Sequence, residues 1–195
     1  AGGLAIYGGV IGAALTLIVF TKVRKQSFFS MADSGVLGLI TGQIIGRWGN
    51  FFNCEAFGGF TDNLLAMRIK MSLVNPSMIS QELVDKQIVE NGVAYIQVHP
   101  TFFYESMWNL GVLAFMLWYR KRKKFEGEML WIYFLGYGLG RVWIEGLRTD
   151  QLKLPGTGMA VSQLLSAALV CVAAAVIVTR HRKLKAEKEN MRTEP

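Results

Sequence analysis

Two long segments of this chain contain no charged residue, and this feature limits the folds that the chain can adopt. They are residues 2–20 and 159–179. A helix that crosses a bilayer needs about 20 apolar residues, whereas helices of soluble domains carry a polar face. Three further segments, 34–53, 101–119 and 129–146, carry very few charges. With 52% hydrophobic residues, the sequence predicts an all-α integral membrane protein, a multi-span bundle of about five transmembrane helices.

We expect residues 1–195 to form a single membrane domain. Residues 58–98 are the only sizeable segment outside the predicted spans, and we expect them to form a small extracytoplasmic cap in which residues 80–91 are an amphipathic helix. Residues 180–195 form a basic tail, where His181 is expected to be solvated. The two cysteines, Cys54 and Cys171, stand in separate segments. They indicate neither a disulfide framework nor a metal site.

The Lys and Arg residues predict the orientation. Fourteen of the 21 follow the first, third and fifth spans and lie on one side of the membrane if the spans alternate, whereas five lie on the other side. Cytoplasmic loops collect such residues, so the multi-pass chain is expected to keep its C-terminus in the cytoplasm. Contact with the anionic lipid bilayer explains the net charge of +7, and no nucleic acid partner is expected.

Several ionisable residues lie inside or beside the predicted spans, where a charge costs roughly 2.5 to 3.5 kcal/mol and usually marks a functional path. Arg141, Glu145 and Arg148 are spaced i, i+4 and i+7, which places them on one helical face. Ion pairing alone explains this stripe as well as a function does. Arg47 reaches the same side from another span, so that three guanidiniums face two carboxylates. The excess positive charge predicts an anion, and in a bilayer the natural one is a phospholipid phosphate.

Two asparagines and a glutamate follow Arg47. Asn50 and Asn53 are placed so that a continued helix carries them on a face related to that of Arg47, and Glu55 stands just beyond. Amide groups can bind glycerol hydroxyls. Hydrogen bonding between helices is the alternative for a single asparagine in a membrane.

Three other functions fit parts of this pattern. An anion or lipid transporter with an arginine-lined path also explains buried charges, although no second copy of the Arg47 motif is found. A phosphatidyl transferase that uses a cytidine-linked donor would need clustered aspartates for a metal, which the spans lack. A purely structural membrane partner is the third alternative, and it predicts that Arg47→Ala disturbs assembly and not chemistry.

The same residues resemble a known family along nearly the whole chain. The run Gly46–Gly58 resembles the signature of prolipoprotein diacylglyceryl transferases, and the similarity continues in Val98–Thr101, Tyr104–Glu105, Gly136–Arg141, Glu145 and Arg148. The resemblance implies a bacterial plasma-membrane enzyme without metal or other cofactor. It implies transfer of the diacylglyceryl group of phosphatidylglycerol to the lipobox cysteine of a prolipoprotein signal peptide, with release of glycerol phosphate.

By this similarity Arg47 is a lipid-binding arginine, and Arg141 and Glu145 are an essential pair. The expected phosphatidylglycerol site comprises Arg47, Asn50, Asn53, Glu55, Gly58 and Arg148, and the expected catalytic residues are Arg141, Glu145, Tyr7 and His99. The base that takes the thiol proton stays open among His99, Tyr7, Glu55 and Glu145, because some members have a histidine in place of Tyr7. His99 is a lone histidine, for which a structural role, as a helix cap or bonded to a carbonyl, is favoured over catalysis. Glu105 is expected to pair with an arginine or to bond Tyr7 or Asn109, and so to act through a neighbouring residue.

Members of the family usually carry additional membrane segments upstream. This chain starts at Ala1 directly in a predicted span. Counting by span length, we expect a fragment that lacks roughly the first two spans.

Overall fold

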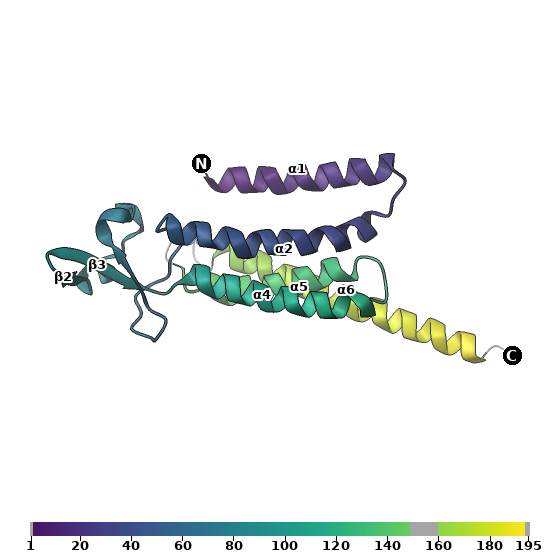
Figure 1. Ribbon diagram of the computed structural model, residues 1–195. Helices are drawn as coiled ribbons and strands as arrows, with labels where there is room; N and C mark the ends of the chain where they lie inside the picture. Colours follow the sequence, from purple (N-terminus) through teal and green to yellow (C-terminus); the bar gives the residue numbers. More distant parts are fainter. Residues whose placement is uncertain (1, 149–159, 194–195) are drawn as a thin grey trace.

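The computed structural model describes residues 2–148 and 160–193, without the side chains of residues 2–7, 10 and 193. Its long helices are α1 (Gly2–Val23), α2 (Phe28–Phe52), α4 (Thr101–Tyr119), α5 (Glu128–Glu145) and α6 (Val161–Thr193). Helices α2, α4, α5 and α6 lie side by side in a bundle, and α1 runs along α2 at its edge (Figure 1). The prediction of a helical bundle is therefore confirmed.

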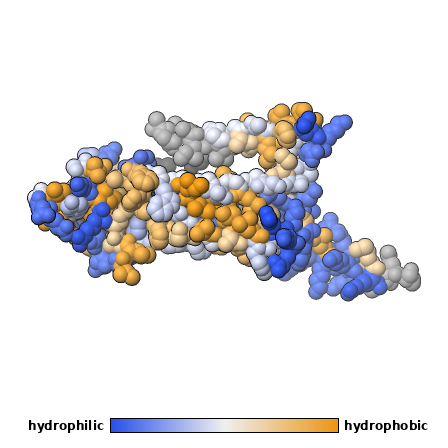
Figure 2. Space-filling view, in the orientation of Figure 1, coloured by the Kyte–Doolittle hydropathy of each residue, from blue (hydrophilic) through white to orange (hydrophobic). Residues whose placement is uncertain are grey.

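The bundle has an apolar core and an apolar outer surface. Ile40 and Met116 are fully buried in the core, where they pack with Val36, Met129, Ile132 and Tyr133. Outward-facing leucines are well exposed, with Leu165 at 63%, and hydrophobic residues gather between two hydrophilic ends (Figure 2). Within the described residues, two helices, Phe28–Phe52 and Val161–Arg192, are long and apolar enough to cross a membrane by length and composition. The surface therefore suits lipid contact, while the count of five spans stays a prediction.

Helix α2 begins at Phe28 instead of at Ser34 and therefore contains Asp33. The carboxylate of Asp33 is buried and accepts hydrogen bonds from the backbone N–H groups of Gly127 and Leu130, both at 3.0 Å. Lys123 lies 3.2 Å from the same carboxylate. Two N–H groups at the start of α5 that lack a helical partner are thus satisfied from outside. The predicted span left out Asp33 because of its charge. The helix can include it because the start of α5 supplies its hydrogen-bond partners.

Residues 58–98 form a small lobe at one end of the bundle (Figure 1). Strands β1 (Met67–Lys70), β2 (Ile88–Glu90) and β3 (Val93–Val98) make an antiparallel sheet in the order β1-β3-β2, with Ile69 opposite Ile96. The short helices η1 (Met71–Leu73), η2 (Pro76–Met78) and α3 (Gln81–Asp85) complete it. Its core comprises Phe57, Ile69, Val74, Leu83, Ile96 and Val98. That this lobe is extracytoplasmic stays a prediction.

The predicted helix over residues 80–91 is wrong beyond its first turns. Helix α3 ends at Asp85, and β2 and β3 follow as a hairpin. Asn91 and Gly92 connect the two strands with φ values of 50° and 76°. Asn-Gly is the pair that tolerates positive φ at both positions of a tight hairpin turn. Pairing with β3 therefore decides the conformation of this segment, which the helical pattern of residues 80–91 did not indicate.

The prediction that His181 is solvated is also wrong. Helix α6 continues through the basic segment, and Nε2 of His181 lies 2.5 Å from Oε1 of Glu128. The Glu128 side chain is 1% exposed, and it also accepts a hydrogen bond of 2.7 Å from the Tyr119 hydroxyl. A buried carboxylate requires such partners. The turn η3 (Arg120–Arg122) connects α4 to this cluster.

Candidate active site

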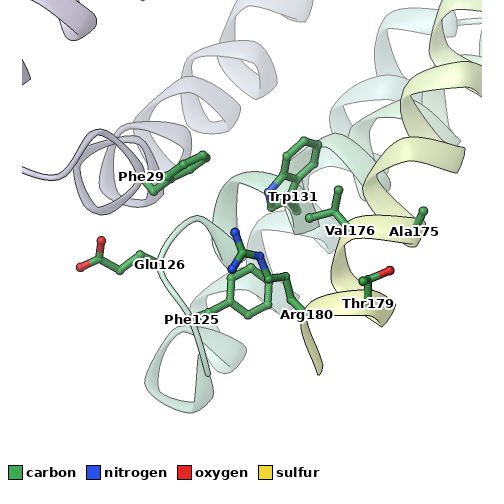
Figure 3. A pocket seen from close by; sticks show the side chains of 8 residues that line it. All are labelled: Phe29, Phe125, Glu126, Trp131, Ala175, Val176, Thr179 and Arg180. Atoms are coloured by element: carbon green, nitrogen blue, oxygen red, sulfur yellow. The ribbon is translucent and has the colours of Figure 1, made fainter. Parts of the chain in front are cut away.

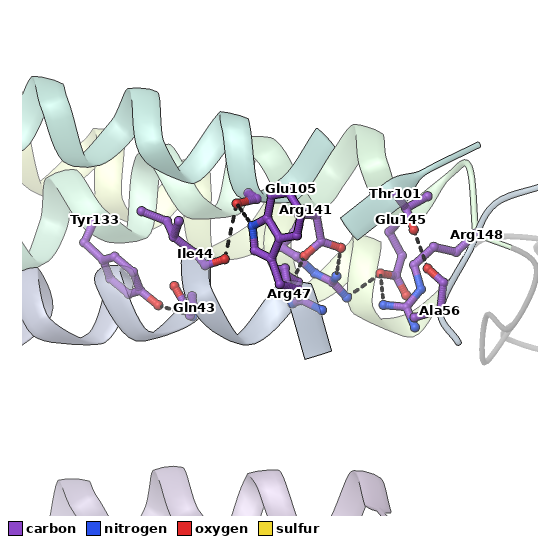
Figure 4. A network of polar contacts seen from close by, with 12 residues as sticks. Gln43, Ile44, Arg47, Ala56, Thr101, Glu105, Tyr133, Arg141, Glu145 and Arg148 are labelled. Carbon is purple, nitrogen blue, oxygen red and sulfur yellow. Dashed lines mark hydrogen bonds and ion pairs between the residues drawn. The ribbon is translucent and has the colours of Figure 1, made fainter. Parts of the chain in front are cut away.

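Charged residues from three helices meet where the bundle joins the lobe, and the carboxylate of Glu105 lies at their centre (Figure 4). Its Oε2 lies 2.6 Å from Nε of Arg47 on α2, and its Oε1 accepts a hydrogen bond of 2.9 Å from Nη1 of Arg141 on α5. Arg47 and Arg141, which are far apart in the chain, are therefore fixed by one carboxylate. The expectation that Glu105 pairs with an arginine is confirmed for two arginines.

Glu145 extends this network toward α6. Its carboxylate pairs with Arg141 one helical turn earlier, and it accepts a hydrogen bond of 2.7 Å from the Ser162 hydroxyl. Nη1 of Arg148 lies 4.0 Å from Oε2 of Glu145. Arg141, Glu145 and Arg148 thus meet in an ion-paired network. The prediction of one helical face is wrong for Arg148, because α5 ends at Glu145 and Arg148 lies beyond it in a bridge with Gly58.

The two signs of charge differ in exposure. The side chains of Glu105 and Glu145 are 4% and 7% exposed, whereas those of Arg47, Arg141 and Arg148 are 20%, 14% and 15% exposed. Counted over the described residues, three guanidiniums against two carboxylates leave one positive charge in excess. Within the described part of the chain, no hydrogen bond engages the two Nη groups of Arg47. The network therefore has the charge and the donors to bind an anion.

The chain after α2 turns sharply. Cys54 and Ala56 adopt left-handed conformations with φ values of 52° and 55°, which cost roughly 1–2 kcal/mol each for residues with a Cβ atom. The side chain of Asn53 donates a hydrogen bond of 3.2 Å to Glu55, and both are exposed. Asn50 is half-buried. Among the described residues these three side chains form no hydrogen bond or ion pair with the arginines, so the structure brings together only part of the predicted site.

Gly58 lies where the lobe, α4 and the end of α5 meet. Its N–H donates to the carbonyl of His99 at 3.0 Å, and it forms an isolated antiparallel bridge with Arg148. A Cβ atom on Gly58 would lie 2.7 Å from Cβ of His99 and 2.8 Å from the carbonyl oxygen of Leu147. The close backbone approach explains the glycine. It also holds Arg148 beside the network.

His99 stands just before α4 and contacts Tyr104. Its Nδ1 lies 3.3 Å from the Tyr104 hydroxyl, which also receives a contact of 3.5 Å from Asn63. Burial lowers the pKa of the His99 imidazole below its ordinary value of 6.5, so the ring is neutral at pH 7. Helix α4 has no side-chain cap. Among the described residues, the ring therefore caps no helix and bonds no carbonyl group.

The fourth catalytic candidate, Tyr7, lies in α1, but its side chain is outside the described residues. A second polar layer lies one turn deeper than Arg47 and Glu105, and sequence reasoning missed its Gln43. There Gln43 donates a hydrogen bond of 2.9 Å to the Tyr133 hydroxyl, and Asn109 is buried. The signal was present, since Gln43 precedes Arg47 by four residues and Asn109 follows Glu105 by four.

Known proteins are similar in sequence to this chain. A family profile described as prolipoprotein diacylglyceryl transferase matches residues 1–179. Proteins named phosphatidylglycerol–prolipoprotein diacylglyceryl transferase are 43% identical over 155 residues in Thermosynechococcus vestitus, 38% over 184 in Lysinibacillus sphaericus and 42% over 159 in Clostridioides difficile. The matches cover 78%, 94% and 82% of this chain but 53%, 63% and 54% of those relatives. The chain thus spans between half and two-thirds of their length. It belongs to the prolipoprotein diacylglyceryl transferase family.

Proposed function

We propose that this protein transfers the diacylglyceryl group of phosphatidylglycerol to the cysteine thiol of a prolipoprotein, the first step of bacterial lipoprotein maturation. The names of its relatives support the activity and both substrates. The observation that carries the proposal is the pairing of Arg47 and Arg141 with one buried carboxylate, Glu105, in a network with an excess positive charge. Such a network suits the phosphate of an anionic lipid.

In the proposed reaction the cysteine thiolate attacks the glycerol carbon that carries the phosphate ester. A carbon–sulfur bond forms, the carbon–oxygen bond breaks, and its electron pair leaves with the phosphate oxygen as glycerol phosphate. The product is a thioether, and no covalent intermediate with the enzyme is required. The guanidiniums of Arg47 and Arg141 stabilise the charge that grows on the departing phosphate, because they are already fixed in place.

Glu105 has a positioning role in this mechanism. It binds Nε of Arg47 and leaves the two Nη groups of that arginine for the phosphate. It binds Nη1 of Arg141, whose Nη2 pairs with Glu145. Arg148, held by the backbone at Gly58, adds positive charge at the edge of the network. In the same proposal the polar groups of Asn50, Asn53 and Glu55 bind the glycerol head group.

The proton of the attacking thiol, whose free pKa is about 8.5, must pass to a base. His99 fits this role because its ring is neutral at pH 7 and its Nε2 has no partner in the described residues. Glu145 fits less well, since Arg141 and Ser162 already engage its oxygens. Tyr7 and Glu55 stay candidates on sequence grounds.

The arrangement in the membrane belongs to the same proposal. Five spans at about residues 2–20, 34–53, 101–119, 129–146 and 159–179 would place the lobe of residues 58–98 and the arginine network on the extracytoplasmic side. The tail of residues 180–195 would lie in the cytoplasm. The excess of basic residues beside the opposite bundle end supports this orientation.

The test uses the protein expressed from its complete reading frame and purified in detergent. It is mixed with phosphatidylglycerol and a lipobox peptide, with and without a chelator, and the peptide is followed by mass spectrometry. We expect the cysteine to gain a diacylglyceryl group in both cases. Arg47→Ala should abolish the gain, whereas the control Arg68→Ala should not, because Arg68 is an exposed strand residue of the lobe.

Three results would contradict the proposal. A mass gain that Arg47→Ala leaves intact would remove the arginine from the chemistry. A gain that the chelator abolishes would indicate a metal-dependent transfer. No gain from folded protein that still binds phosphatidylglycerol would favour a lipid transporter, which a vesicle flux assay then measures.

A further inference from the structure

A cavity of about 620 Å³ lies at the opposite end of the bundle from the arginine network. It is bounded by the first turn of α2, the loop before α5 and the part of α6 where the apolar sequence ends (Figure 3). Its lining residues are Phe29, Phe125, Glu126, Trp131, Ala175, Val176, Thr179 and Arg180. No residue of the proposed active site contributes to it.

The cavity combines apolar walls with two charged groups. Trp131, Ala175 and Val176 provide apolar surface, and Phe29 is 43% exposed beside them. Arg180 points into the opening beside Phe125 in Figure 3. Among the described residues no carboxylate pairs with Arg180, although basic residues surround it on α6. Glu126, on the other side, accepts a hydrogen bond from the Ser27 hydroxyl.

The position of Arg180 matches the surface of a bilayer. Val178 is the last apolar residue before Thr179 and Arg180, and basic residues follow. Basic pockets between helices at a membrane surface bind phospholipid head groups, and arginines near helix ends reach the interface in this way. Apolar walls with an arginine at the opening suit a single ligand that is apolar at one end and anionic at the other. A free phosphate would leave the apolar walls uncovered.

We propose that this cavity binds a phospholipid of the leaflet opposite the active site. The phosphodiester binds Arg180 and Thr179, a hydroxyl of the head group donates to Glu126, and an acyl chain lies against Trp131 and Val176. Phosphatidylglycerol has all three features. The site is separate from the proposed substrate site, and it ties the loop before α5 to α6 through the lipid.

The test uses phosphatidylglycerol with a photoreactive acyl chain, added to the purified protein in vesicles of zwitterionic lipid. Crosslinked peptides are mapped by mass spectrometry, so that labelling around residues 131 and 175–180 is counted separately from labelling near Arg47. We expect labelling of the cavity peptides, which unlabelled phosphatidylglycerol suppresses and diacylglycerol, without a phosphate, does not. Arg180→Ala should reduce this labelling about tenfold, the loss of one charge-assisted hydrogen bond.

Two further variants sharpen the result. Ala175→Trp, which fills the cavity, should also remove the labelling, whereas Arg182→Ala should leave it, because Arg182 is exposed on the same helix and does not line the cavity. Labelling that is equal on outward-facing α6 residues and unchanged in Arg180→Ala would overturn the proposal. Suppression by soluble glycerol phosphate would show a site for free anions, and absence of labelling would show that another segment or partner fills the cavity. Either outcome also refutes a lipid site.

Discussion

Replacing Glu105 by Gln tests whether one carboxylate holds the arginine network together. The substitution keeps the size of the side chain and one carbonyl acceptor but removes the charge between Arg47 and Arg141. The partners lie at 2.6 and 2.9 Å, and Glu105 is 4% exposed. Removing one partner of a buried ion pair costs about 3–5 kcal/mol. We take the lower end, about 3 kcal/mol, because the guanidiniums keep some contact with solvent.

The assay is thermal unfolding in detergent followed by tryptophan fluorescence. For a chain of this size about 3 kcal/mol lowers Tm by about 6–12 °C. The matched control is Glu90→Gln, which breaks the lobe ion pair with Arg68 at 2.7 Å, where both side chains are about half exposed. An exposed pair of this kind contributes less than about 1 kcal/mol. The two ion pairs have similar distances but different burial, so Glu105→Gln should lower Tm clearly more than Glu90→Gln does.

A double-mutant cycle with Arg47→Gln and Glu105→Gln identifies the source of the loss. If the two side chains stabilise each other, the double variant is less destabilised than the sum of the single variants by about 1–3 kcal/mol. Additive effects, or a Glu105→Gln loss as small as that of Glu90→Gln, would refute the argument. Transfer activity should fall in Glu105→Gln even at temperatures where it is folded, because the guanidiniums lose their fixed positions.

Three further predictions concern the surroundings of the site. Gly58→Ala should destabilise the fold by about 1–3 kcal/mol, because the new Cβ atom would lie 2.8 Å from the carbonyl oxygen of Leu147. The control Gly59→Ala should not, because its Cβ atom would have nothing within 4 Å. Equal thermal unfolding of the two variants would contradict this. Asp33→Asn should cost about 1–2 kcal/mol by weakening the cap of α5, measured by urea unfolding, and an unchanged midpoint would exclude the cap. Because burial lowers the pKa of His99 in the folded state, the free energy of unfolding should decrease as pH falls below about 6.5. Between pH 7.5 and 5.5 it should decrease less in His99→Gln than in the unsubstituted protein. An identical decrease would contradict the stated cause.

The family assignment and the outline of the bundle were predictable because both rest on local pattern. The apolar segments are long and nearly free of charge, so each forms a helix whatever its neighbours are. The pair of Arg141 and Glu145 was predictable for the same reason, since helical geometry alone brings i and i+4 together. Arg148 lies beyond the end of α5, and its bridge with Gly58 holds it beside the network. The motif around Arg47 gave the chemistry, because an arginine in an apolar helix needs an anionic partner.

The distribution of contacts within the network could not be predicted. The sequence offered Glu105 as a partner for an arginine, but only the packing of both α2 and α5 against α4 gives it two. The missed hydrogen bond between Gln43 and Tyr133 joins two residues that are 90 positions apart in the chain. Such contacts depend on the rotation and depth of each helix in the bundle, and those depend on the whole core.

The errors have the same origin. Residues 80–91 have a helical pattern, but pairing with β3 satisfies more backbone groups than a short exposed helix would. His181 has basic neighbours in the sequence, which suggested a solvated position, but its ring pairs with the buried carboxylate of Glu128. The sequence by itself determined which segments are apolar helices and which residues carry charge. Tertiary structure decided which charges meet, because a buried charge must find its partner wherever the packing of distant segments places one.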